Sequence, residues 1–265
     1  MTRRLCLVTG ASAGIGAAFA REYASHGYDV FLTARRLDRL ETLASEIRLH
    51  YGVEAFVVAA DLSQPGGVDT VLAAVASEGR DIDALVNNAG YGLPGAYAAT
   101  TWADQQAFLQ VMVTTVAEFA HKVLPGMLER RFGRIVNIAS LAGLVPGTAG
   151  HTLYGATKAL LVRFSQSLHA ESVGTGVHVT AVCPGFTYSE FHDANGTREA
   201  TRELPSWLWL GADEVASLGY EAAEANRTIC VTGSPNKAIA LLAKILPDDW
   251  AMALTARQSR QFRKL

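Results

Sequence analysis

The chain has 265 residues, of which 49% are hydrophobic and 18% are charged, with 23 basic and 25 acidic side chains. This composition predicts one α/β domain over residues 1–265, with enough apolar material for a sheet covered on both faces, and excludes intrinsic disorder. The formal charge of -2 provides no basic field for nucleic acid, and the apolar run Leu5–Val8 is too short for a signal peptide or membrane span. We therefore expect a cytoplasmic protein that binds neither nucleic acid nor membrane.

Short runs of apolar and β-branched residues alternate along the chain with longer helical patterns. In chain order, strands are predicted at residues 5–10, 29–35, 55–62, 84–90, 134–140, 177–185 and 228–233, and helices among them at 17–26, 37–51 and 68–78. This alternation predicts a doubly wound, seven-stranded parallel sheet of the Rossmann type with helices on both faces. Because such sheets bind ligands at the carboxyl ends of their strands, we expect the functional site along that edge.

A glycine-rich segment, Thr-Gly-Ala-Ser-Ala-Gly-Ile-Gly at residues 9–16, follows the first predicted strand. Its glycines allow a tight turn, a close approach of backbone to a pyrophosphate, and close packing of the next helix. The amino terminus of that helix faces the phosphate charge. A glycine pattern alone often marks only a turn, but its place between a strand and a helix favours dinucleotide binding. The candidate cofactor residues here are Gly10, Ser12, Ala13, Gly14, Ile15 and Gly16.

The second predicted strand ends in Thr33-Ala34-Arg35-Arg36. An NAD-binding enzyme usually has an acidic residue there to hold the ribose hydroxyls, and this chain has none. Arg35 can instead pair with a 2′-phosphate through two parallel hydrogen bonds. The alternative is that Arg35 and Arg36 are simply solvated at a helix start, where basic side chains oppose the helix dipole. We predict NADP(H) as the cofactor.

Further motifs follow the later strands. They are Asp61 after the third strand, Asn-Asn-Ala-Gly at 87–90, Ser140 after the fifth, Tyr-Gly-Ala-Thr-Lys at 154–158, and Pro184-Gly185 after the sixth. Together with the glycine-rich segment, these residues resemble the short-chain dehydrogenase/reductase family in order and spacing, from Leu5 to about Gly185. The resemblance implies an oxidoreductase that transfers a hydride between NADP(H) and a carbonyl or alcohol substrate.

The candidate catalytic residues are Ser140, Tyr154 and Lys158. Four residues apart on a helix, Tyr154 and Lys158 share one face. A phenol with a pKa of about 10 exchanges a proton at neutral pH only if positive charge stabilises its phenolate, and Lys158 and an oxidised nicotinamide can supply that charge. Ser140 can donate a hydrogen bond to the substrate oxygen. By resemblance, Tyr154 is the general acid in reduction and the general base in oxidation.

The resemblance also implies further cofactor contacts and an assembly. Asp61 and Leu62 would meet the adenine, Asn88, Ala89 and Gly90 the adenosine side, Tyr154 and Lys158 the nicotinamide ribose, and Pro184, Gly185 and Thr187 the nicotinamide end, with Ser189 in place of the family's phosphate-binding threonine. A homodimer or homotetramer is implied, formed through the helices near residues 101–129 and 154–172. The three cysteines have no metal-ligand spacing, and we predict no metal site.

One position departs from the family pattern. In Phe-Leu-Gln-Val-Met-Val-Thr-Thr (108–115), Met112 stands where the family usually has an Asn that holds a water linking the active-site lysine to solvent. A thioether is a weak acceptor without a donor, so it fills this role poorly. Three alternatives remain: Thr114 or Thr115 substitutes, turnover is slow, or the protein is an NADP(H)-binding regulatory or scaffold protein with weak or no turnover.

The segment at residues 186–211 interrupts the strand and helix rhythm and predicts a cover over a substrate pocket. Its part 207–210, together with residues 91–93 and 141–145, would form an apolar wall, which favours a hydrophobic or bulky carbonyl compound. Alternatively, Trp207 and Trp209 fill a core or an oligomer interface. The tail at residues 250–265 ends in a basic run typical of a solvated helix end.

Overall fold

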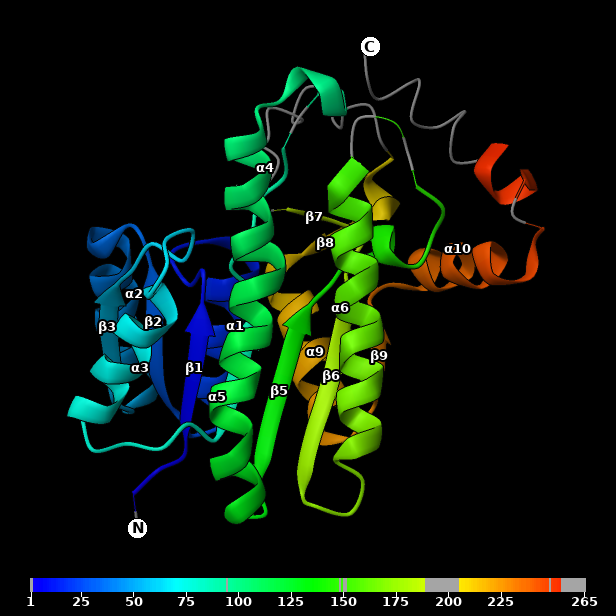
Figure 1. The fold of residues 1–265 in the computed structure, drawn as a ribbon. Helices are drawn as coiled ribbons and strands as arrows, with labels where there is room; N and C mark the ends of the chain where they lie inside the picture. Colours follow the sequence, from blue (N-terminus) through cyan, green and yellow to red (C-terminus); the bar gives the residue numbers. More distant parts are fainter. Residues whose placement is uncertain are drawn as a thin grey trace.

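The computed structural model describes residues 2–93, 95–147, 149, 152–188, 205–247 and 249–253. Seven strands form one parallel sheet in the order β3-β2-β1-β4-β5-β6-β9 (Figure 1). They are β1 (Leu5–Thr9), β2 (Asp29–Ala34), β3 (Ala55–Ala59), β4 (Ala84–Asn87), β5 (Gly133–Ile138), β6 (Val177–Cys183) and β9 (Ile229–Val231). The predicted doubly wound sheet is confirmed. The chain runs outward from β1 to β3 and then returns to β4 beside β1, which creates the switch point where such sheets bind dinucleotides.

Helices cover both faces of the sheet. On one face lie α1 (Gly14–Ser25), α2 (Leu37–Tyr51) and α9 (Ala212–Glu224), and on the other α3 (Gly67–Ser77), α5 (Thr115–Glu129) and α6 (Thr152–Glu171). Figure 1 shows α5 and α6 in front of β5 and β6, with α9 behind. Because both faces are covered, every residue of β1 and β5 is buried, which explains their nearly continuous apolar sequences.

The ends of the first two helices follow from local sequence. Helix α2 ends at Gly52, whose φ of 63° is left-handed, and Arg48 and His50 in its last turn complement the helix dipole. Helix α1 begins at Gly14, and its N-cap residue, Ala13, has no side chain that could cap the first N–H groups. These backbone donors can therefore serve a ligand.

One continuous helix runs from Trp102 to Glu129 through α4 (Trp102–Leu109), a π turn η2 (Gln110–Thr114) and α5. By length and composition alone it could cross a membrane. Its buried residues, among them Phe108 and Phe119, pack inside the protein. The π turn contains Met112, and such turns often occur at functional sites.

The two ends of the segment predicted to cover the pocket lie side by side, because β7 (Phe186–Tyr188) pairs in parallel with β8 (Trp209–Gly211). Residues 189–204, including Ser189, lie outside the described residues, as does most of the predicted tail. The remaining elements are η1 (Tyr97–Ala99), η3 (Leu141–Gly143), η4 (Ser206–Leu208) and α10 (Ser234–Ile245). Helix α10 extends away from the sheet in Figure 1.

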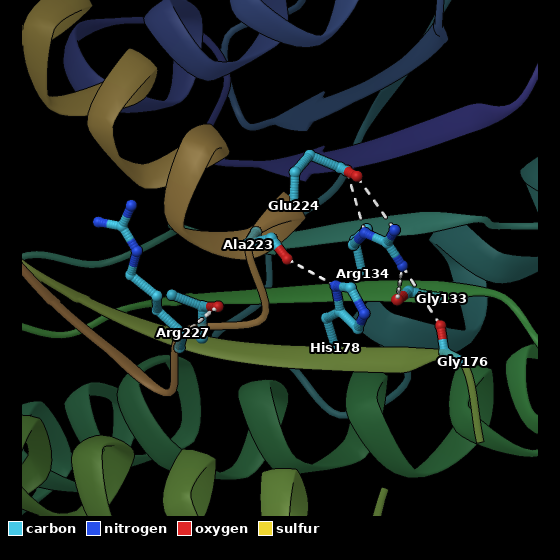
Figure 2. A network of polar contacts seen from close by, with 8 residues as sticks. Gly133, Arg134, Gly176, His178, Ala223, Glu224 and Arg227 are labelled. Atoms are coloured by element: carbon cyan, nitrogen blue, oxygen red, sulfur yellow. Dashed lines mark hydrogen bonds and ion pairs between the residues drawn. The ribbon is translucent and has the colours of Figure 1, made fainter. Parts of the chain in front are cut away.

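A polar network joins α9 to the amino-terminal ends of β5 and β6 (Figure 2). The guanidinium of Arg134 donates to both carboxylate oxygens of Glu224 at 3.0 Å. His178 Nδ1 donates to the carbonyl of Ala223 at 2.8 Å. Burial is the main cause that lowers the pKa of His178, which keeps this imidazole neutral at physiological pH. The network lies at the edge of the sheet opposite the predicted site.

Candidate active site

The structure places the described residues of the predicted site along one edge of the sheet. Each lies at or just beyond the carboxyl end of a strand, except Tyr154 and Lys158, which lie on α6. In strand order from β3 to β6 they are Asp61 and Leu62, then Arg35, then residues 10–16, then residues 88–90, then Ser140, then Pro184 and Gly185, with Thr187 on β7. The structure therefore brings these residues to one edge of the sheet, and their role as a site stays a prediction.

The glycine-rich loop is held against the end of β4. Asn88 Nδ2 donates to the carbonyls of Thr9 and Gly10 at 2.9 and 3.2 Å, and the backbone N–H groups of Asn88 and Ala89 donate to Thr9 Oγ1 at 2.9 and 3.0 Å. A Cβ on Gly16 would lie 2.4 Å from the Gly10 carbonyl oxygen, so only glycine fits this turn. The loop and the start of α1 fit a dinucleotide pyrophosphate, because the backbone can approach it closely.

Two arginines lie beside this loop at the end of β2. Arg36 donates from Nη2 to Ser12 Oγ at 3.0 Å. Arg35 is exposed and makes no hydrogen bond within the described part of the chain. Hydrogen bonds from Ser63, with a smaller contribution from the charge of Arg35, lower the pKa of Asp61. The contact of Arg36 with the loop was missed from the sequence, since it depends on how β1 and β2 pair.

Ser140, Tyr154 and Lys158 lie together. The hydroxyls of Tyr154 and Ser140 are hydrogen-bonded, and Ala142 N donates to Ser140 Oγ at 3.1 Å. Lys158 Nζ donates to the carbonyl of Ile138, the last residue of β5, at 2.6 Å. It lies 5.7 Å from the centroid of the Tyr154 ring. The sheet edge thus fixes the ammonium group beside the phenol.

Burial controls the protonation of this cluster. It raises the pKa of Tyr154 to about 12, although the hydrogen bond with Ser140 acts in the opposite direction. It also lowers the pKa of Lys158 to about 8. The expectation that positive charge from Lys158 and an oxidised nicotinamide stabilises the phenolate concerns the enzyme with its cofactor bound, and it stays a prediction. At neutral pH Tyr154 is a neutral phenol and Lys158 is largely charged.

The loops after β5 and β6 pack against the lysine. A Cβ on Gly143 would lie 2.6 Å from the backbone carbonyl carbon of Lys158, so glycine allows η3 to contact α6. Leu141 N donates to the carbonyl of Pro184 at 2.8 Å and joins the two loops. Residues 141–145 were predicted to form part of the pocket wall, whereas residues 141–143 form η3, which packs against α6.

A buried chain of side chains links β4, β5 and α6. Asn87 Nδ2 donates to Asn137 Oδ1 at 2.9 Å, Asn137 Nδ2 donates to Ser165 Oγ at 2.9 Å, and Ser165 Oγ donates to the Leu161 carbonyl at 2.7 Å. The roles of Asn137 and Ser165 were missed from the sequence, where Asn137 falls inside an apolar strand. Such fully buried hydrogen bonds fix the relative position of the elements that carry the site.

Met112 is 1% exposed and packs against the loop after β4, because a Cβ on Gly90 would lie 2.8 Å from its Sδ. Thr115 Oγ1 donates to the carbonyl of Leu62 at 3.1 Å, and Thr114 is exposed. The hydroxyl hydrogen of Thr115 is therefore already used. The alternative that Thr114 or Thr115 substitutes for an Asn at the position of Met112 stays a prediction.

A small, partly open hollow adjoins Tyr154. The described residues that line it are Leu93, Gly95, Tyr97, Thr100, Gln105, Phe108, Leu153 and Tyr154. Among the residues predicted to form the apolar wall of the substrate pocket, Leu93 lies in this lining. Trp207 is 64% exposed, and Trp209 stacks on Tyr188 with ring centroids 4.8 Å apart, so both tryptophans lie outside the described lining.

Residues 4–200 match the family model of the short chain dehydrogenases. An NADP-dependent 3-hydroxy acid dehydrogenase of Salmonella typhi is 36% identical over 219 residues, 82% of this chain and 81% of that protein. A short-chain dehydrogenase from Sphingobium yanoikuyae in complex with NADPH is 30% identical, with a TM-score of 0.80 over 97% of this chain and 94% of the other. A bulky-bulky ketone specific alcohol dehydrogenase from Comamonas testosteroni is 28% identical, with a TM-score of 0.76 over 100% and 96%.

The chain belongs to the short-chain dehydrogenase/reductase family. It is an oxidoreductase that acts on alcohol and carbonyl substrates with NAD(P)H, which confirms the enzyme class predicted from the sequence.

Proposed function

We propose that this chain is an NADP(H)-dependent carbonyl reductase and alcohol dehydrogenase in which Ser140, Tyr154 and Lys158 are the catalytic residues. The cluster of these three side chains carries the proposal. Tyr154 is hydrogen-bonded to Ser140, while Lys158, held by the end of β5, lies 5.7 Å from the phenol ring. Tyr154 also lines the hollow, so a substrate bound there would meet its hydroxyl.

The proton step follows from the state of the cluster. In reduction, Ser140 donates a hydrogen bond to the substrate oxygen and Tyr154, as a neutral phenol, donates its proton to that oxygen. A bound NADPH supplies the hydride. In oxidation, Tyr154 must accept the proton, and its phenolate depends on nearby positive charge because burial raises the pKa of the phenol.

NADP(H) is proposed over NAD(H) because the end of β2 carries positive charge and no acid. Arg36 is fixed by Ser12, and exposed Arg35 can reach a 2′-phosphate beside it. The glycine-rich loop and Asn88 would hold the pyrophosphate side of the cofactor. Relatives named for NADP and NADPH support this choice.

A hydrophobic or bulky substrate is proposed because apolar side chains line the hollow beside Tyr154. Leu93, Phe108 and Leu153 are among them. Pockets of this kind take up apolar ligands and use a few polar groups for orientation. The related alcohol dehydrogenase that is specific for bulky ketones supports the proposal.

Oxidation of NADPH in the presence of a panel of bulky ketones and aldehydes tests this function. Tyr154→Phe removes the proton donor and keeps the ring, so we expect kcat to fall by about 10²–10⁴-fold. Binding of NADPH, measured by its fluorescence, should persist in the variant. Turnover of the variant at the wild-type rate would contradict the assignment of Tyr154.

We also propose that Met112 slows the return of a proton to Lys158, because the hydroxyl of Thr115 is bonded elsewhere. Met112→Asn should then raise kcat and leave KM for NADPH unchanged. An unchanged kcat would show that proton return does not limit turnover. Inactivity of both proteins on the whole panel would support the alternative of an NADP(H)-binding regulatory or scaffold protein.

A homodimer or homotetramer formed through α4, α5 and α6 is a further part of the proposal. Trp102, Leu128 and Leu160 on these helices are 65%, 38% and 43% exposed. Exposed large apolar side chains on neighbouring helices are typical of an interface. Light scattering of the purified protein measures the assembly, and a monomer would contradict it.

A further inference from the structure

Gln105 is a buried polar side chain in the lining of the hollow beside Tyr154. It lies in the first turn of α4, is 5% exposed, and lines the hollow with Leu93, Phe108 and Leu153. Its Nε2 donates to Thr100 Oγ1 at 2.5 Å. Its Oε1 is buried and has no hydrogen-bond partner among the described residues. One end of this amide is therefore satisfied and the other is not.

The hydrogen bonds of Thr100 determine which end of the amide is unpaired. The Thr100 hydroxyl donates to the carbonyl of Tyr97 at 2.9 Å, so its single hydrogen is used. The Gln105 atom that faces Thr100 must then be the donor, Nε2, and a flipped amide would place two acceptors together. The unpaired atom is consequently an acceptor, and what it lacks is a donor.

The position of this acceptor is fixed by the start of α4. Thr101 caps the helix by accepting from Asp104 N at 3.2 Å, and Gln105 N donates to the Thr101 carbonyl at 3.1 Å. Thr100, the residue before the cap, holds the amide through Nε2. A buried amide oxygen without a partner is unfavourable, so a ligand donor that reaches it gains a hydrogen bond that the protein alone does not supply.

We propose that Gln105 is a specificity-determining residue whose Oε1 accepts a hydrogen bond from a hydroxyl or N–H group of the substrate. This inference rests on the proposed carbonyl reductase function and narrows its substrate class. The preferred substrates are apolar ketones, or the corresponding alcohols, that carry a second hydrogen-bond donor away from the reacting carbon. Tyr154 then binds the reacting oxygen while Gln105 binds the donor within the same hollow.

The chemistry of the lining distinguishes this class from simple acids. A carboxylate only accepts hydrogen bonds and would face another acceptor at Gln105 Oε1. The described residues that line the hollow include no Lys or Arg that could pair with a carboxylate. A hydroxyl or N–H group is therefore the complementary partner.

Matched phenyl ketones test the proposal with NADPH as the reductant. Each carries a hydroxyl, an amino, a methoxy or a methyl group at the para or meta position, so that donors are compared with groups of similar size that cannot donate. We expect wild-type kcat/KM to be about tenfold higher for the better-placed hydroxyl or amino ketone than for its methoxy and methyl counterparts. Gln105→Met, which keeps length and flexibility, should reduce this ratio to about one.

A control variant and two further measurements separate specificity from structure. Gln106→Met, at an exposed glutamine on the same helix, should behave as wild type. Gln105→Met should still bind NADPH and reduce the methyl ketones at close to the wild-type rate. Loss of both properties would show a structural role and overturn the inference.

The outcomes distinguish this inference from the function on which it rests. If the wild type reduces the methyl ketones but shows no preference for a donor at either position, water alone satisfies Oε1 and the inference is wrong. A preference that survives in Gln105→Met overturns it equally. If the wild type reduces no ketone at all, the proposed function itself fails.

Discussion

Burial shifts the pKa values of Tyr154 and Lys158 in opposite directions, and in both residues it favours the neutral form. Both groups are buried although burial disfavours the charged form of each. Tyr154 is therefore held as a proton donor, and Lys158 can gain or lose a proton near neutral pH. Such perturbed groups in a concave site are typical of catalysis rather than of structure.

The ammonium group of Lys158 makes the free energy of unfolding depend on pH. Its pKa is about 8 in the folded chain and 10.5 in its ordinary state, so the unfolded chain binds more protons between these values and stability rises with pH there. Lys158→Met removes the penalty of a buried charge, which is fully present below pH 8. We expect the stability advantage of the variant to shrink by about 1 kcal/mol between pH 7 and pH 9. Urea unfolding at the two pH values measures it, and an equal advantage at both would contradict the burial argument.

Arg35 should decide between the two nicotinamide cofactors. Because a charge-assisted hydrogen bond contributes about 1.5–3 kcal/mol, Arg35→Ala should raise the Kd of NADPH by about 10–100-fold. The Kd of NADH, which has no 2′-phosphate, should change by about twofold or less. Fluorescence titration with each cofactor gives both numbers. Equal losses for the two cofactors would show that Arg35 does not bind the phosphate.

The three candidate catalytic residues could be picked out from the sequence, while the contacts of Arg36 and Gln105 could be found only in the structure. Ser140, Tyr154 and Lys158 lie in motifs whose order and spacing are themselves informative. Arg36 reaches Ser12 only because β1 and β2 are neighbours, and the unpaired Oε1 of Gln105 depends on how Thr100 is bonded. Interactions between side chains from separate segments leave no periodic pattern in the sequence.

At the scale of elements, the contact between η3 and α6 explains why a glycine stands beside the active-site lysine. Gly143→Ala would place a Cβ 2.6 Å from the Lys158 backbone, which has little freedom to move within a helix. We expect the free energy of unfolding to fall by about 1–3 kcal/mol, and kcat to fall because Lys158 is displaced. Urea unfolding and steady-state kinetics measure the two effects.

Gly155 on α6 provides the matched control. A Cβ there would lie 3.5 Å from the carbonyl oxygen of Ala142, an ordinary contact. Gly155→Ala should therefore stabilise the protein by about 0.5–1 kcal/mol, as alanine does within a helix. If Gly143→Ala were as stable as Gly155→Ala, the close approach of η3 to α6 would not matter.

The seven strands of the sheet were predictable because each is a short apolar run between longer helical patterns. Two other features of the fold could not be predicted from the sequence. The π turn at Gln110–Thr114 interrupts a helix without changing its apolar periodicity enough to be seen. The pairing of β7 with β8 joins two three-residue strands separated by about 20 residues of chain, too short a pattern to predict.

At the scale of the whole molecule, the edge at the carboxyl ends of the strands and the edge at their amino ends differ in the residues that they carry. The carboxyl edge carries the site, with exposed Arg35 and the unpaired oxygen of Gln105. The amino edge is joined to α9 by the network in Figure 2, where Arg134 binds Glu224 and His178 donates to the Ala223 carbonyl. Stability should therefore be alterable at this edge without changing catalysis.

Glu224→Ala tests this separation. The side chain of Arg134 is 9% exposed, so removal of its partner leaves a nearly buried guanidinium with two hydrogen bonds fewer. Hydrogen bonds to charged groups contribute about 1.5–3 kcal/mol, and we expect the free energy of unfolding to fall by about 2 kcal/mol. Glu221→Ala, an exposed residue of the same helix, should cost less than about 0.5 kcal/mol. We expect kcat and KM for NADPH to be unchanged in both variants at a temperature where they are folded, which would show that the amino edge serves stability alone. A loss of activity in folded Glu224→Ala would instead show that the two edges are coupled.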